Sequence, residues 1–200
     1  MTTRVFDFPR QIDAELLAAY RGVQSSIISD CMERAYGTIG IRPYHRAGHM
    51  AGTAVTVKTR PGDNLALNEA LKLARPGDVI VVDGGGDVSQ ALAGEIMVTQ
   101  ALSLGLAGFV IDGAIRDLGA IKVMDFPCYA QDVCHRGPYK NGPGAINVPV
   151  CVGGLIVNPG DLVVGDDDGV IALSSELARE LLPKIRAAEE WEAQLLAGYR

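Results

Sequence analysis

The sequence predicts one mixed α/β domain in which helices pack over a sheet and a β-rich second layer completes the fold. Up to about residue 125, short apolar runs typical of buried strands alternate with segments of helical apolar spacing. From Phe126 to Leu173 the apolar runs are short and separated by Gly, Pro and Asp, which favours a succession of strands. No linker or low-complexity segment divides the 200 residues, and 48% hydrophobic content is enough for one sizeable core.

The first third of the chain indicates three helices and a strand. Residues 11–36 carry apolar side chains at helical spacing, and Gly22 would divide them into two helices. The apolar run at residues 54–58 predicts a strand. Asp63 is expected to cap a helix over residues 64–74, whose leucines would form its apolar side.

The tripeptide Pro-Gly-Asp occurs at residues 61–63, 76–78 and 159–161. Pro fixes φ and Gly accepts positive φ, so the pair suits a tight turn. Two copies precede similar apolar runs, at residues 79–82 and 162–164, which indicates similar strand-forming units. The shared pattern is too short to establish a duplication.

The remaining elements follow from the same signals. A helix is predicted to begin near Gly94 and to end at Gly105, where glycine suits the C-terminal cap. A strand over residues 109–112 would end in a glycine turn, and a short helix would span residues 116–124. Ser174 or Ser175 would open a long polar C-terminal helix that tolerates Pro183 early or is kinked by it. Short strands are expected at residues 148–152, 155–157, 162–164 and 170–173.

Composition argues against several classes of protein. A formal charge of −6 and scattered basic residues disfavour nucleic-acid binding. The four cysteines show no C-x-x-C pairing, so reduced thiols are expected rather than a zinc site or a disulfide framework. The N-terminus carries charges where a signal peptide needs an apolar stretch, and no segment approaches a membrane span. We therefore expect a cytoplasmic protein with neither nucleic acid nor membrane as a partner.

The most informative stretch runs from Val110 to Asp117, because it predicts a buried strand that delivers Arg116 and Asp117 side by side. An Arg fork recognises a carboxylate through two parallel hydrogen bonds. A lone Asp suits Mg²⁺ or Mn²⁺, which keep several waters and accept further oxygens from a substrate. The alternative is structural, with Asp capping a helix and Arg as its solvated neighbour.

A second candidate segment contains Asp83-Gly84-Gly85-Gly86-Asp87 and then Gly94-Glu95-Ile96-Met97. Backbone N–H groups at a helix N-terminus bind anions, and a glycine there lets a ligand approach closely. Neither the dinucleotide fingerprint nor the P-loop pattern is present. A plain turn is the alternative.

Other polar groups give weaker signals. Asp166-Asp167-Asp168-Gly169 could suggest a metal loop, but an EF-hand would need a Glu at the twelfth position, so a turn between strands is favoured. The three histidines are scattered, and neither a Ser-His-Asp arrangement nor a G-x-S-x-G elbow is visible. Nucleophilic hydrolysis therefore has little support.

Several motifs, taken together and in order, resemble the RraA-like family, which includes the 4-hydroxy-4-methyl-2-oxoglutarate/4-carboxy-4-hydroxy-2-oxoadipate aldolases and the regulators of ribonuclease E. The resemblance covers about residues 25–175 of a single domain spanning 1–200, with the C-terminal helix at about 175–198. The motifs are Pro61-Gly62-Asp63-Asn64, 74–78, 83–87, Gly94-Glu95-Ile96-Met97, 112–117, Arg136-Gly137-Pro138, 142–144, 159–161 and 166–170.

The resemblance implies a swivelling β/β/α fold, assembled as a homotrimer or homohexamer. It also implies a lyase: a class II pyruvate aldolase that depends on a divalent metal and acts on a small 2-oxo dicarboxylic or tricarboxylic acid. Carried over to this sequence, Asp117 would be the metal ligand and Arg116 would bind the pyruvate moiety, both as catalytic residues. The backbone of Gly94, Glu95, Ile96 and Met97 would hold the substrate carboxylate.

The sequence departs from the aldolase pattern at one position. Aldolase members resemble Arg-Asp followed, after two residues, by Glu or Asp, whereas Ala120 stands there in this chain. The missing carboxylate makes oxaloacetate decarboxylation an alternative, since that reaction needs no hydroxyl deprotonation. Glu189, Glu190 or Glu192 would compensate from a neighbouring subunit, or simply form a solvated helix face. A non-catalytic binder that regulates ribonuclease E is a third possibility.

Overall fold

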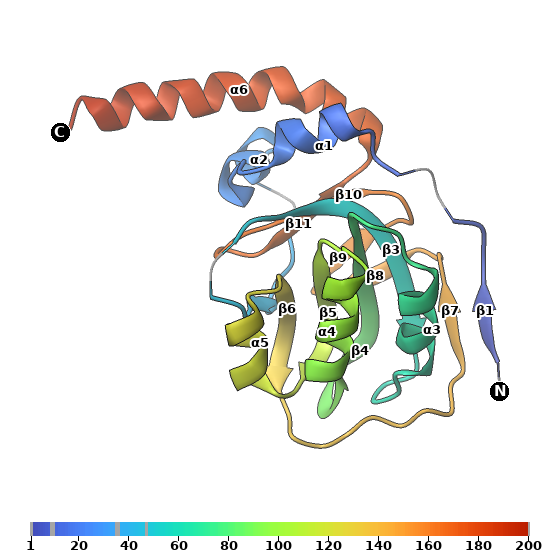
Figure 1. Ribbon diagram of the computed structural model, residues 1–200. Coiled ribbons are helices and arrows are strands. Elements are labelled where there is room, and N and C mark those ends of the chain that lie inside the picture. The colour runs from blue at the N-terminus through green and yellow to red at the C-terminus, as the bar shows by residue number, and fades with distance from the viewer. Residues whose placement is uncertain (1, 9–10, 35–36, 47, 200) are drawn as a thin grey trace.

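The computed structural model describes residues 2–8, 11–34, 37–46 and 48–199. Four parallel strands form the centre of its main sheet, and three helices alternate with them along the chain (Figure 1). This arrangement confirms the mixed α/β prediction. The strands are β3 (Met50–Thr59), β4 (Asp78–Ala93), β5 (Gly108–Ile115) and β6 (Cys128–Val133), and the helices are α3 (Leu65–Leu73), α4 (Glu95–Ser103) and α5 (Leu118–Met124).

Shorter strands extend this sheet on both sides. Within the described residues the order is β1-β7-β3-β4-β5-β6-β2, and β10 pairs with both β3 and β11. A separate pair, β8 and β9, forms a small antiparallel hairpin. The bounds are β1 (Thr3–Val5), β2 (Arg42–Pro43), β7 (Gly144–Ile146), β8 (Val150–Val152), β9 (Leu155–Val157), β10 (Leu162–Gly165) and β11 (Val170–Leu173).

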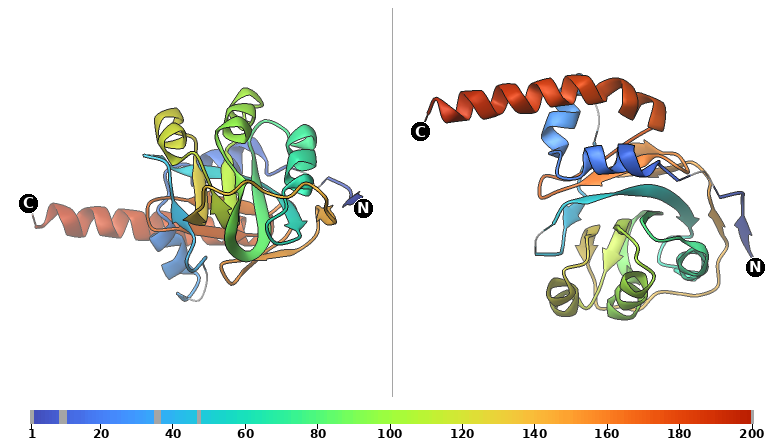
Figure 2. Two further views of the ribbon diagram at one scale, coloured as in Figure 1. Left: turned by 90° about the horizontal axis from the view of Figure 1, so that it is seen from below. Right: turned by 45° about the horizontal axis from the view of Figure 1, so that its top comes forward.

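Figure 2 shows the layers of the fold, and three apolar clusters of buried side chains hold these layers together. The first lies between α3, α4, α5 and one face of the parallel strands, and includes Leu67, Val98 and Ile121. The second fills the space between the parallel strands and the β8–β11 layer. The third packs β10 and β11 against α1 (Ala14–Tyr20), α2 (Ser25–Cys31) and α6 (Ser175–Ala197). Helices α3–α5 and helices α1, α2 and α6 therefore lie on opposite sides of the β-structure.

Most predicted elements are confirmed. Gly22, with φ of 81°, separates α1 from α2, and Gly105, with φ of 70°, follows the last turn of α4. Ser174 caps α6 by accepting from the Leu177 N–H, and α6 continues through Pro183. The region after Phe126 forms the expected series of short strands. Part of the predicted 11–36 helical segment, residues 35–36, lies outside the described residues.

Two glycine segments lie within strands, although a turn was predicted at Gly113 and was the alternative for the segment with Gly84, Gly85 and Gly86. Strand β5 does not turn at Gly113 but continues to Ile115, because Gly113 pairs with Asp87 of β4. Gly84, Gly85 and Gly86 lie within β4, which passes through them with a register shift against β5. At Gly113 a Cβ would lie 3.1 Å from Leu92 Cδ1 and 3.2 Å from the Asp87 carbonyl oxygen. The glycine therefore serves close packing between strands rather than a turn.

Within the described residues, no helix combines the length and the apolar character that crossing a membrane would need.

Asp13 joins the N-terminal helix α1 to the C-terminal helix α6. It caps α1 by accepting from the Leu16 N–H at 2.9 Å, and it also pairs with Arg179 of α6. The hydrogen bond to Leu16, followed by the contact with Arg179, lowers the pKa of Asp13 below its ordinary value of 3.8. A lowered pKa stabilises the fold above the unfolded-state value, and the contribution is lost as pH falls through the folded-state value. We expect Asp13→Ala to lower the melting temperature at neutral pH, and the difference from the unmodified protein to shrink below pH 3.8.

Thermal unfolding followed by circular dichroism between neutral and acidic pH measures this difference. Asp13→Asn is the matched control, because it keeps a capping oxygen and removes the charge. A melting-temperature difference for Asp13→Ala that stays constant into the acid range would contradict the assignment.

Candidate active site

The Arg116–Asp117 pair lies at the junction between β5 and α5. The Arg116 N–H donates to the Ala93 carbonyl oxygen at 2.9 Å, which fixes the end of β5 against the end of β4. Asp117 follows in the left-handed region, with φ of 61° and ψ of 38°, at the N-cap position of α5. Asp tolerates this conformation better than most residues do. Strained backbone of this kind is concentrated at functional sites.

Helix α4 begins directly against this pair. The Asp117 Oδ2 atom accepts from the Glu95 N–H at 3.0 Å and lies 3.5 Å from Arg116 Nε. Both side chains are about 39% exposed, so they remain within reach of a ligand. The carboxylate is therefore held at the positive end of the α4 dipole and beside a guanidinium group.

Gly94 makes this close approach possible. Its backbone is extended, with φ of −162°, so any residue could adopt its conformation. The space, however, admits no side chain, because a Cβ would lie 2.5 Å from Asp117 Oδ2 and 2.8 Å from Arg116 Cγ. Glycine is needed here for contact between the helix start and the Arg-Asp pair.

The four backbone groups predicted to hold a carboxylate are not equally available. The Glu95 N–H binds Asp117, and the Met97 N–H donates to the Gly94 carbonyl oxygen at 3.0 Å. Within the described residues the Gly94 and Ile96 N–H groups have no acceptor. These two groups remain for an anion at the start of α4.

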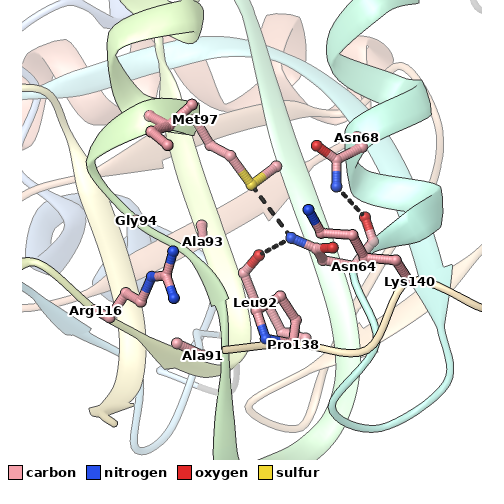
Figure 3. Close-up of a pocket in the computed structure, with 11 residues that line it drawn as sticks. Asn64, Asn68, Ala91, Leu92, Ala93, Gly94, Met97, Arg116, Pro138 and Lys140 are labelled. Carbon is pink, nitrogen blue, oxygen red and sulfur yellow. Dashed lines mark hydrogen bonds between the residues drawn. The ribbon is translucent and has the colours of Figure 1, made fainter. Parts of the chain in front are cut away.

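A pocket of about 100 Å³ opens beside Arg116 (Figure 3). It lies at the carboxyl ends of β4 and β5, the edge at which ligands commonly bind in open α/β sheets. Its volume suits a small organic molecule rather than a dinucleotide. Asp117 stands next to Arg116, beside the pocket rather than in its wall. The lining residues are Asn64, Asn68, Ala91, Leu92, Ala93, Gly94, Ile96, Met97, Arg116, Pro138 and Lys140.

Besides Ala91, Leu92 and Ala93 at the end of β4, the lining residues not predicted to belong to the site are Asn64, Asn68, Pro138 and Lys140. Asn64 and Pro138 belong to motifs that carry the family resemblance, and Lys140 follows the second of these motifs by two residues. These motifs were therefore the only feature of the sequence that could have indicated these lining residues. Their position against Arg116 depends on long-range packing, which local sequence patterns do not reveal.

The donor set fits a magnesium-type ion. Within the described residues, no group of three His, Cys, Asp or Glu side chains is placed to hold a metal. The Oδ2 atom of Asp117 is already engaged, and its Oδ1 atom has no partner in the described part of the chain. One carboxylate with a free oxygen suits Mg²⁺, which keeps several waters and takes substrate oxygens. Asp117 is the residue that would hold such an ion.

The acidic cluster and two of the histidines have structural roles. Asp166 accepts from the Ser25 N–H at 2.6 Å and the Ser25 hydroxyl at 2.7 Å, in the turn between β10 and β11. His49 bridges the Gly22 N–H and the Val23 carbonyl oxygen. His45 is buried, and its ring packs against that of Tyr129 in a T-shaped arrangement with the centroids 5.0 Å apart. The turn interpretation of the acidic cluster is thus confirmed.

A small pocket with cationic side chains at the carboxyl edge of parallel strands is typical of proteins that bind small anions. The chain belongs to the RraA-like family, whose sequence model, described as Aldolase/RraA, matches residues 25–172.

Relatives agree in sequence and in fold. A protein from Halalkalibacterium halodurans, named provisionally as a 4-hydroxy-4-methyl-2-oxoglutarate aldolase, is 39% identical over 88% of this chain and 84% of its own length. RraAS2 from Streptomyces coelicolor, described as an unusual member of the RNase ES inhibitor RraA protein family, superposes with a TM-score of 0.85. It is 28% identical, covering 92% of this chain and 98% of that one. An uncharacterized protein from Pseudomonas syringae pv. tomato also gives a TM-score of 0.85, at 26% identity over 96% of this chain and 91% of that one. The fold is therefore that of RraA proteins.

Proposed function

We propose that the protein is a divalent-metal-dependent lyase that cleaves 4-hydroxy-4-methyl-2-oxoglutarate or 4-carboxy-4-hydroxy-2-oxoadipate to pyruvate and a second oxo acid. The observation that carries the proposal is the Arg116–Asp117 pair, held against the start of α4 beside a small pocket. The aldolase name of the Halalkalibacterium halodurans relative supports the same substrate class.

The chemistry requires stabilisation of negative charge. Cleavage breaks the C3–C4 bond after the C4 hydroxyl loses its proton, and leaves the enolate of pyruvate, which is then protonated at C3. A divalent cation held by Asp117 would supply Lewis-acid stabilisation of this charge. Arg116 binds the carboxylate of the pyruvate moiety and adds a second fixed positive charge. The Gly94 and Ile96 N–H groups orient that carboxylate at the start of α4.

Ala120 favours a second candidate reaction, the decarboxylation of oxaloacetate. The Ala120 N–H donates to the Asp117 carbonyl oxygen at 3.0 Å, so residue 120 lies one turn beyond Asp117 in α5. A methyl group at this position cannot deprotonate a hydroxyl. Decarboxylation forms the same enolate without that step, and would use Arg116 and Asp117 unchanged.

An acidic group from another subunit would restore the missing function. In one chain α6 lies on the opposite side of the β-structure from α4 and α5 (Figure 1). A glutamate of α6, such as Glu190 or Glu192, would therefore act only in the site of a neighbouring copy. This route accords with the homotrimer or homohexamer that we propose for the assembly.

The deciding experiment measures pyruvate release from both hydroxy acids and from oxaloacetate, each with Mg²⁺ and with EDTA. Cleavage of a hydroxy acid that EDTA abolishes is the expected result. Turnover of oxaloacetate alone would select the decarboxylase. Absence of turnover on all three would overturn the lyase proposal and favour a protein-binding regulator. The structural relative from Streptomyces coelicolor is described as a member of an RNase ES inhibitor family.

A further inference from the structure

Residues 138–142, called the strap below, contribute Pro138 and Lys140 to the lining of the pocket, and Lys140 lies across the pocket from Arg116 (Figure 3). Backbone hydrogen bonds fasten the strap to the start of α3. The Tyr139 N–H donates to the Gly62 carbonyl oxygen at 2.8 Å, and the Asn64 N–H donates to the Tyr139 carbonyl oxygen at 3.0 Å. The strap is therefore fixed immediately before Lys140.

Asp63 fastens the strap immediately after Lys140. Its side chain is fully buried, and its Oδ2 atom accepts from the Asn141 N–H at 2.8 Å and from the Gly142 N–H at 2.9 Å. The Oδ1 atom accepts from the Leu65 N–H at 2.9 Å. Asp63 was predicted as the cap of this helix, but the N-cap position is Asn64. Asp63, one residue earlier, binds the first N–H of the helix and also joins α3 to the strap. Loss of one of its acceptor oxygens would leave backbone N–H groups, such as that of the buried Gly142, without a partner, which is costly.

These attachments place Lys140 and Arg116 on opposite sides of the pocket, with the Lys140 amine directed inward over Asn64 (Figure 3). No residue that lines the pocket carries a carboxylate. Within the described part of the chain, Lys140 forms no ion pair. A ligand with an anionic group at each end would place one group beside Arg116 and the other beside Lys140.

Asn64, which also lines the pocket, carries a buried acceptor without a partner. Its Nδ2 group donates to the Leu92 carbonyl oxygen at 2.9 Å and contacts Met97 Sδ at 3.5 Å. Both partners are acceptors, so the orientation of the amide is fixed and Oδ1 faces the other way. This Oδ1 atom is buried and has no hydrogen-bond partner in the described residues. Unpaired buried acceptors are rare in folded proteins.

We propose that Lys140 determines specificity by binding the second carboxylate of the substrate while Arg116 binds the first, and that Asp63 is the positioning residue that holds the strap. The inference rests on the proposed 2-oxo acid function and deepens it, because it assigns a residue to the part of the substrate that distinguishes a diacid from a monoacid. Charge-assisted hydrogen bonds are among the stronger polar contacts, so the loss of Lys140 should weaken diacid binding by about tenfold or more.

The test compares 2-oxoglutarate with 2-oxopentanoate, which has the same chain length and lacks the second carboxylate. Neither ligand has a C4 hydroxyl group, so binding is measured without retro-aldol turnover, by calorimetry in the presence of Mg²⁺. The unmodified protein is expected to prefer 2-oxoglutarate. Lys140→Met should remove this preference by weakening only 2-oxoglutarate, whereas Lys140→Arg should keep it. Lys72→Met is the control, because Lys72 is exposed on α3 and does not line the pocket.

Asp63→Asn tests the positioning role. It should lower the preference as Lys140→Met does, and the double variant should lose nothing further, because both changes act through one contact. On a hydroxy acid that is cleaved, either variant should raise KM more than it lowers kcat.

Equal weakening of both ligands by Lys140→Met, or an undiminished preference for 2-oxoglutarate, would overturn the inference even if Asp63→Asn failed to fold. Neither result would affect the lyase proposal, provided that the unmodified protein releases pyruvate. If the unmodified protein bound neither oxo acid, this inference would fail, and pyruvate release alone would decide the lyase proposal.

Discussion

Asp117→Asn is expected to reduce metal-dependent pyruvate release by about a thousandfold or more, since a catalytic metal contributes several kcal/mol of transition-state stabilisation. Asn tolerates the left-handed conformation at this position, with φ of 61°, and can still accept from the Glu95 N–H. It lacks the negative charge that would hold a divalent ion. The fold should therefore persist while metal binding is lost, as turnover measured against Mg²⁺ concentration would show.

Asp125→Asn is the matched control for this variant. Asp125 is the C-cap residue of α5 and also has positive φ, at 51°. The substitution there places Asn in the same left-handed backbone conformation, but outside the site. The activity of the Asp125→Asn variant and its response to Mg²⁺ should match those of the unmodified protein. Full activity of Asp117→Asn at ordinary Mg²⁺ concentrations would remove Asp117 from the proposed metal site.

Gly94→Ala is expected to lower kcat/KM by about a hundredfold, because displacement of a reacting group by even 1 Å can have an effect of that size. The new Cβ would lie 2.5 Å from Asp117 Oδ2, so the carboxylate must move away from the Glu95 N–H. The side chains of Arg116 and Asp117 are partly exposed and can move, so the free energy of unfolding should fall by no more than about 1–3 kcal/mol. Steady-state kinetics and thermal unfolding together separate these two effects.

Gly119→Ala makes the same chemical change a short distance along the chain. A Cβ at Gly119 would meet no atom within 4 Å, so it tests the substitution without the clash. We expect unchanged kinetics and a slightly more stable α5, since Ala exceeds Gly in helix propensity by about 1 kcal/mol. If Gly94→Ala kept normal kcat/KM, the close contact between α4 and the Arg-Asp pair would have no part in catalysis.

The order of helices and strands could be predicted because periodicity and turn residues act locally. Asp63 shows where such reasoning stops. Its place before a helix indicated a cap, but two of its acceptor contacts go to Asn141 and Gly142, far along the chain. Gly113 shows a different limit. Glycine after an apolar run favours a turn, yet here it allows β5 to pass close to Leu92 and Asp87. Local patterns do not distinguish these two uses of glycine.

The candidate site was partly predictable for the same reason. Arg116 and Asp117 are adjacent in sequence, and Gly94 precedes a recognisable helix, so each could be identified alone. The opposite wall could not, because Lys140 and Asn64 come together only through the strap and the start of α3. Which N–H groups of α4 remain available also depends on Asp117 lying against the helix, a tertiary contact.

The length of β4 has a mechanical consequence. Its first half, up to Asp83, pairs with both β3 and β5. Its second half pairs with β5, and its Ala91 N–H donates to the Arg136 carbonyl oxygen at 2.9 Å, in the segment that follows β6. Gly85 and Gly86, both with positive φ, lie between the halves. Amide hydrogen exchange should therefore be slowest at Val81 and Val82 and faster through the glycines. The part of the pocket formed by the end of β4, residues 91–93, would then move together with β5 and Arg116. The distance between the Arg116 side chain and this part of the pocket would stay constant while the rest of the sheet fluctuates.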